Sequence, residues 1–280
     1  MSTIKFGTGT FIVREEASRD LFGVMEKIAR IGYDGLELLG FFSQKPEAIR
    51  KKADELSLQI LGDHVQADTF LADPEQVIND HITLGVDYIT IAWPANTPRL
   101  PGMLAYQDML TKIAGLCSLC VKARITPLFH NHGGDFEGHP THYETILDAC
   151  ADVGMRAEPD IGWMYVAGVD VPAYLQKYRD RTPVIHLKDV YYTASECLGD
   201  RDHLPAERGD SARGGFEFRP TGYGIVENAV LMAHYLRCNP KWFVIDHDCA
   251  YDRDPYEDLR ISLAYTRHLL SITEGMVPSV

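Results

Sequence analysis

The stretch Pro127-Leu-Phe-His-Asn-His132 decides how we interpret the rest of the chain. Its apolar start leads to two imidazoles, His130 and His132, and Gly133-Gly134 follows at once. Residues at positions i and i+2 of a β-strand point to the same side. If this stretch is a strand, both imidazoles therefore face whatever surface the strand lines.

Three later stretches repeat this arrangement, in which a short apolar run ends in a polar side chain. They are the segments 157–163, 184–189 and 243–248, and they carry Asp160, His186 and Asp246. A polar group that can bind a metal or a proton thus recurs where each expected strand stops. This repetition is the main indication of function in the sequence.

Expected strands and helices alternate along the chain at a spacing of roughly 30 residues, which is typical of βαβ units. Further strands are expected at 4–11, 33–39, 58–64 and 86–92, and helices at 19–31, 46–56, 74–85, 106–123, 143–151, 171–178, 226–235 and 255–270. Strict alternation predicts parallel strands with helical crossovers. Eight units in about 250 residues fit a closed (β/α)8 barrel. We therefore predict an α/β protein with one TIM-barrel domain over residues 1–280.

An open, doubly wound sheet is the alternative fold. It is disfavoured because no G-x-G-x-x-G motif follows an early strand, and Gly7-Thr-Gly9 lacks the third glycine. One segment interrupts the alternation: residues 190–222 are rich in charged residues and glycine and are too long for an ordinary loop. We expect a lid or partner contact there, or a solvated insertion.

In a TIM barrel the C-terminal ends of the strands meet at one mouth. That mouth would collect Glu37, His64, His130, His132, Asp160, His186, Lys188 and Asp246. Imidazole and carboxylate ligands without thiolate suit a divalent ion, with Mn expected first and Mg, Co or Zn as alternatives. A single histidine is more often a structural residue, but four strand ends in succession are harder to explain in that way. Buried without a cation, such a cluster would also be costly.

The composition limits the classes of partner. The 280 residues include 27 Lys and Arg against 40 Asp and Glu, giving a formal charge of −13. So acidic a protein repels phosphate backbones, which argues against nucleic acid. The N-terminus has no basic segment leading into an apolar one, and no apolar run reaches the length of about 20 residues that spans a bilayer. We expect a soluble, cytoplasmic protein, with homo-oligomers possible in principle.

Over essentially its whole length, the sequence resembles the xylose-isomerase-like TIM-barrel superfamily. Its members are sugar isomerases and epimerases, with inosose dehydratase and endonuclease IV relatives. The segment 129–132 is similar to a Y-H-N-H motif of that family, and 186–189 to its H-x-K-D motif. Further similarities are Asp160, Trp163 and Gly168 to D-x-x-W…G, 242–248 to W-x-V-x-E-x-D, and Asp254, Pro255, Arg260 and Ser262 to D-P…R-x-S.

The resemblance implies a metal held by His130, Asp160, His186 and Asp246. Two departures bear on the chemistry. Epimerases of this superfamily commonly use glutamates on the fifth and eighth strands, and here those positions are His130 and Asp246. The usual Gly-Glu-Gly is Gly222-Tyr-Gly224. The resemblance therefore supports the metal site better than a proton shuttle between two glutamates.

A divalent ion at this mouth would act as a Lewis acid and stabilise the enediolate formed when an α-proton is removed. Lys188 could add positive charge at the same oxygen, or pair with Asp189. The proton could be moved by His132, His64 or Glu37, and activity driven by His132 would follow an ionisation near neutral pH. We expect Trp163 and Asn131 to bind substrate, although Trp163 could equally pack at the barrel rim.

The sequence is compatible with four functions. The first is a metal-dependent isomerase or epimerase of a keto-sugar or related polyol, and a close rival is a lyase such as an inosose dehydratase or a keto-glycoside eliminase. Both start from the same enediolate, and the lyase then expels a β-substituent. A nuclease related to endonuclease IV is disfavoured because Trp163 stands where the nucleases supply a histidine and because the net charge is −13. A non-catalytic sugar-binding protein is the fourth.

Overall fold

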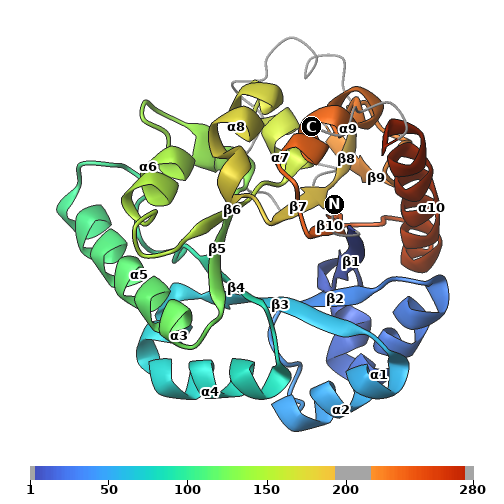
Figure 1. The fold of residues 1–280 in the computed structure, drawn as a ribbon, viewed down its shortest axis with the longest axis horizontal. Helices are drawn as coiled ribbons and strands as arrows, with labels where there is room; N and C mark the ends of the chain where they lie inside the picture. Colours follow the sequence, from blue (N-terminus) through green and yellow to red (C-terminus); the bar gives the residue numbers. More distant parts are fainter. Residues whose placement is uncertain (1–3, 193–215, 275–280) are drawn as a thin grey trace.

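The computed structural model describes residues 4–192 and 216–274. Figure 1 shows a ring of strands surrounded by helices. All pairs between neighbouring strands in the ring are parallel. In spatial order the eight strands are β6 (Arg156–Glu158), β5 (Thr126–His130), β4 (Tyr88–Ala92), β3 (Gln59–Gln66), β2 (Gly35–Leu38), β1 (Lys5–Gly9), β10 (Trp242–Ile245) and β7 (Val184–Leu187). A parallel bridge between Asp160 and His186 joins the two ends of the sheet. The predicted (β/α)8 barrel is confirmed.

The helices lie on the outside of the strands (Figure 1). They are α1 (Arg14–Ile31), α2 (Pro46–Leu56), α3 (Ala67–Ala72), α4 (Pro74–Leu84), α5 (Leu104–Lys122), α6 (His142–Ala149), α7 (Ile161–Val166), α8 (Val171–Tyr178), α9 (Asn228–Arg237) and α10 (Pro255–Glu274), with 3-10 turns at Phe11–Val13, Gly133–Phe136 and Arg179–Arg181. The short helices α3 and α7 were not predicted. They follow strand ends directly, where a few residues carry too weak a periodicity to be recognised.

Helix α1 begins at Arg14, whereas the helical spacing of its apolar residues begins only at Arg19. Asp20 has non-helical backbone angles and divides the helix, and its carboxylate accepts a hydrogen bond from the Gly23 N–H. The helix predicted from Arg19 onward corresponds to the second part. It ends as predicted at Gly32, whose φ of 104° is a left-handed conformation that glycine adopts without strain.

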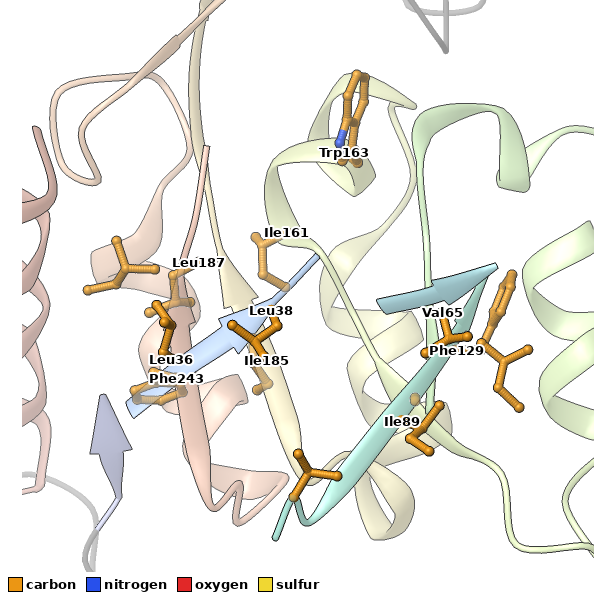
Figure 2. Packing of buried hydrophobic residues seen from close by; sticks show 14 of the residues in the cluster. Leu36, Leu38, Val65, Ile89, Phe129, Ile161, Trp163, Ile185, Leu187 and Phe243 are labelled. Atoms are coloured by element: carbon orange, nitrogen blue, oxygen red, sulfur yellow. The ribbon is translucent and has the colours of Figure 1, made fainter. Parts of the chain in front are cut away.

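The barrel interior is built in two layers because side chains alternate along each strand. The lower layer is apolar and consists of Leu61, Tyr88, Leu128, Val184, Trp242 and Val244. Two residues further along four of these strands, the upper layer holds Thr90, His130, His186 and Asp246. Residues between these positions, such as Phe129 and Ile185, lie outside the lower layer and belong to the larger core cluster. Figure 2 shows part of this larger cluster. The apolar layer thus closes the barrel below the polar groups.

Part of the charged segment 190–222 forms an antiparallel pair that the sequence did not predict. It joins β8 (Asp189–Tyr192) to β9 (Phe216–Arg219). Residues 193–215, the centre of the expected lid, lie outside the described residues. The buried carboxylate of Asp189 accepts hydrogen bonds from the N–H groups of Gly222, Gly224 and Val226. It therefore ties the chain after β9 to the mouth of the barrel.

Replacing Asp189 with Ala should lower the free energy of unfolding by about 2–3 kcal/mol, because several backbone donors lose a charged acceptor. Urea unfolding followed by circular dichroism measures the change. Asp180→Ala is the matched control, since its side chain is 88% exposed and, among the described residues, its carboxylate pairs only with Arg179, at 3.4 Å. It should change the free energy of unfolding by less than roughly 0.5 kcal/mol. Equal effects of the two substitutions would contradict this role of Asp189.

Among the described residues, no helix is both long and apolar enough to cross a membrane.

Candidate metal centre and active site

The mouth of the barrel brings together four ligand-bearing residues that we call the three-histidine group. Its members are His64 on β3, His130 on β5, Glu158 on β6 and His186 on β7. One ligand atom from each lies within 4.8 Å of the corresponding atoms of the others. The carboxylate of Glu158 lies 3.4 Å from His186 Nε2 and 3.7 Å from His64 Nε2.

A second set, the two-aspartate group, consists of Asp160, His186 and Asp246, again with ligand atoms within 4.8 Å of one another. Its members are buried. The two groups share His186. The predicted ligands His130, Asp160, His186 and Asp246 are therefore close in space, but they are divided between two clusters.

Glu37 on β2 contacts the three-histidine group. Its Oε2 lies 2.9 Å from His186 Nε2 and 3.1 Å from His64 Nε2. Burial alone would raise the pKa of Glu37, but the adjacent imidazoles outweigh it and lower the pKa. Conversely, burial favours the neutral form of His64, yet Glu37 raises the pKa of His64 to about 9. This site therefore favours an ionised Glu37 beside a cationic imidazole. The alternative arrangement is Glu37 and the imidazoles around a metal cation.

Glu158 is the site residue that sequence analysis missed. Its side chain is fully buried, and Oε2 accepts a hydrogen bond from Thr90. Burial, followed by the charge of Glu37, raises the pKa of Glu158. The strand is only three residues long and Pro159 follows it, so its sequence shows no alternation that would single out Glu158. The available signal was register, because Glu158 stands opposite His130 in the parallel β5–β6 pair.

Several buried polar atoms of these groups have no hydrogen bond of acceptable geometry within the described part of the chain. They are Glu37 Oε1, His64 Nε2, His130 Nδ1, Glu158 Oε1, Asp160 Oδ2, both ring nitrogens of His186, and Asp246 Oδ1. Such atoms cost free energy unless something satisfies them. Nitrogen and oxygen donors gathered at this spacing suit a divalent ion. The donor set therefore fits the metal that the family resemblance implies.

Lys188 lies inside the two-aspartate group with only 1% of its surface exposed. Its Nζ is 3.0 Å from Asp160 Oδ2 and 3.2 Å from Asp246 Oδ2, and it donates a hydrogen bond to Asp248 at 2.7 Å. Burial alone would lower the pKa of Lys188, but these carboxylates raise it well above 10.5. Lys188 is thus a fixed cation, and its expected pair with Asp189 gives way to pairs with these three aspartates.

A cavity of about 510 Å³ opens above this cluster, and His64, His130, His132, Trp163 and Asp248 are among its lining residues. His132 is exposed to it, and the ring centres of His132 and His130 are 5.2 Å apart. Enclosure by the surrounding protein, then the charges of Lys188 and Arg99, lower the pKa of His132. His132 is therefore neutral at neutral pH, and the ionisation expected near pH 7 moves to lower pH.

The two predicted substrate-binding residues differ in their surroundings. Asn131 is fully buried, accepts a hydrogen bond from the Asp160 N–H and donates one to the Asp160 carbonyl. Its amide therefore positions Asp160. The indole of Trp163 packs edge-on against Phe216 and Phe218, and its buried Nε1 has no hydrogen-bond partner among the described residues. Trp163 thus lines the cavity with its ring, while its N–H is buried.

Comparisons with solved structures show that this fold recurs at low sequence identity. A sugar phosphate isomerase/epimerase from Parabacteroides distasonis is 16% identical, with 94% of each chain covered and a TM-score of 0.68. The 3-keto-D-glucoside 4-epimerase from E. coli is 16% identical over 95% of this chain and 100% of that chain, with a TM-score of 0.69. The D-psicose 3-epimerase from Clostridium cellulolyticum H10 is 12% identical over 95% and 99%, also with a TM-score of 0.69.

No curated protein sequence gives a significant match to this chain. The model of the xylose isomerase-like TIM-barrel family, in contrast, matches residues 25–228. That range covers more than half of the 280 residues and includes β2 to β9. The chain therefore belongs to the xylose isomerase-like TIM-barrel family.

Proposed function

We propose that this protein is a divalent-metal-dependent isomerase or epimerase of a keto-sugar or related polyol. The observation that carries the proposal is the cluster of imidazoles and carboxylates with unsatisfied atoms at the base of the 510 Å³ cavity. The ion, with Mn expected first, would be held by residues around His186. When bound, it would supply Lewis-acid stabilisation of the negative charge that develops on a substrate oxygen.

The remaining residues supply proton transfer and orientation. His132 faces the cavity, where its imidazole can accept the proton from the carbon next to the carbonyl and return it. The ammonium of Lys188 places fixed positive charge beside the reacting oxygens. Trp163, one of the residues lining the cavity, offers its ring for the apolar side of a sugar.

The charges around the cavity favour an uncharged substrate. Arg99, which lines the cavity, lies 3.5 Å from Asp135, and Lys188, deeper in the mouth of the barrel, pairs with three carboxylates. A phosphate group would need cationic partners that are not already neutralised in this way. The polyol hydroxyl groups of an unphosphorylated sugar make no such demand. We therefore expect a free or glycosidic keto-sugar to be a better substrate than its phosphate.

Incubation of the Mn-loaded protein with a panel of keto-sugars and their phosphates in D2O tests the function. NMR should show deuterium entering the position next to the carbonyl, together with an isomer or epimer, for at least one unphosphorylated sugar. Exchange that ends in an unsaturated product and loss of a β-substituent would assign the lyase instead. If no panel member exchanges deuterium in the presence of any divalent ion, the proposal is wrong.

A further inference from the structure

We propose that the three-histidine group holds the divalent ion, and that the ammonium of Lys188 serves as the permanent cation of the two-aspartate group. This inference rests on the proposed function and adds the identity of the metal ligands. It replaces the ligand set that the family resemblance implies. The argument depends on which side of the His186 ring each group occupies.

The two ring nitrogens of His186 face different partners. Nε2 lies 3.4 Å from Glu158 Oε1 and 2.9 Å from Glu37 Oε2. Nδ1 instead faces Asp246, with 3.8 Å to Oδ2. The nitrogens of an imidazole point in different directions, so one ring cannot offer the same atom to both groups. An ion among the histidines would use Nε2, and an ion between the aspartates would use Nδ1.

The aspartate side already contains a cation. Lys188 Nζ is at hydrogen-bond distance from Asp160 and close to Asp246, and its carbon chain is buried. A divalent ion bound by the same two carboxylates would lie within a few ångströms of that ammonium and be repelled by it. The stem of Lys188 packs against Gly162, where an added Cβ would come within 2.7 Å of the Lys188 Cβ. This close packing fixes the base of the side chain, from which the ammonium reaches the aspartates.

On the histidine side, nitrogen and oxygen atoms without hydrogen bonds lie at a spacing that suits metal ligands. Ligands bound tetrahedrally at 2.0–2.2 Å lie roughly 3.3–3.6 Å apart. Glu158 Oε1 lies 3.4 Å from His186 Nε2, within that range, and the other oxygen, Oε2, lies 3.7 Å from His64 Nε2. Glu158 Oε1 and both Nε2 atoms have no hydrogen bond of acceptable geometry in the described structure. An ion at this place would satisfy all of them.

The aspartates then take a supporting role. Imidazoles that bind metals usually present their other ring nitrogen to a carboxylate, which fixes the ring and strengthens the ligand. Asp246 Oδ2 lies 3.8 Å from Nδ1 of His186, and Asp160 Oδ2 lies 3.7 Å from Nε2 of His130, so each carboxylate faces a ring nitrogen that it could support once an ion is bound. Lys188 holds both carboxylates in place. The two groups would thus form one centre, with an ion on one side and an ammonium on the other.

Proton NMR of the Co²⁺-loaded protein tests this assignment without an activity assay. Each imidazole bound to Co²⁺ gives one strongly shifted, exchangeable N–H signal. We expect three such signals, and His64→Gln should remove one of them. Two signals, unaffected by His64→Gln, would support the family-like set of His130, Asp160, His186 and Asp246. One signal would place the ion in the two-aspartate group, and either of these results would overturn the inference.

Calorimetric titration with Co²⁺ provides a second readout that separates ligand from supporting carboxylate. Glu158→Gln keeps an oxygen acceptor for Thr90 but should weaken Co²⁺ binding by more than a hundredfold, whereas Asp246→Asn should cost roughly tenfold, as for an outer partner. The reverse order would overturn the inference and leave the proposed function standing. If the wild-type protein binds neither Co²⁺ nor Mn²⁺, the metal-dependent function itself fails. Circular dichroism verifies that each variant is folded.

Discussion

Replacing His132 with Gln should lower the rate of deuterium exchange into substrate by about a hundredfold or more, the usual contribution of a placed acid or base. His132 is exposed to the cavity and belongs to neither of the two metal-ligand groups. Its ring centre lies 5.7 Å from that of Trp163, so a sugar held against the indole would be within its reach. Gln preserves polarity and approximate size but cannot accept and return a proton in this way.

The metal content of the His132→Gln protein should equal that of wild type, because His132 is not one of the proposed ligands. His268→Gln is the matched control, since this histidine is exposed on α10 and lies away from the mouth. Near-normal exchange by the His132 variant would transfer the proton step to Glu37, since His64 is one of the proposed ligands. Loss of metal would instead make His132 a ligand.

The barrel was predictable from the sequence because its pattern extends over the whole chain. Each strand end combines an apolar run with a polar residue, and helices with 3.6-residue periodicity separate them. Helix α2 begins and ends where predicted, since Pro46 starts it and Leu56 is its last residue. Strand alternation also explains why His247, next to Asp246, is buried away from the mouth, with its Nε2 3.3 Å from the Asp258 carboxylate.

The arrangement of the site was less predictable, because it depends on contacts between strands distant in sequence. The sequence indicates that His64, His186 and Glu37 lie at the mouth, but not that they contact one another. Glu158 could have been found only by aligning β6 with β5, and a strand of three residues gives little basis for such an alignment. The β8–β9 pair was unpredictable for a related reason, since long-range antiparallel pairing leaves no local signal.

Lys188 illustrates the same limit. Its neighbour Asp189 suggested a local salt bridge, but in the structure the side chains of Lys188 and Asp189 contact different partners. Alternation places Lys188 inside the barrel with His186, while Asp189 binds the backbone of residues 222–226. Only the closed ring of strands brings the three aspartates around the ammonium.

Replacing Lys188 with Met should lower the free energy of unfolding by about 3–5 kcal/mol, measured by urea unfolding with a chelator present. Met retains most of the buried stem but removes the charge, so the carboxylates of Asp160, Asp246 and Asp248 would face one another without compensation. The raised pKa of Lys188 keeps the ammonium charged at every pH up to at least 9, so the loss should be present throughout pH 6–9.

Lys177→Met is the matched control for this prediction. Lys177 also contacts two carboxylates, with 2.9 Å to Glu144 and 3.5 Å to Asp148, but 44% of its side chain is exposed. Solvent screens such pairs, so the control should lose less than about 1 kcal/mol. The difference between the two variants isolates the effect of burial on an otherwise similar ion cluster. If Lys188→Met cost no more than Lys177→Met, the ammonium would not be the cation that compensates the aspartates at the mouth.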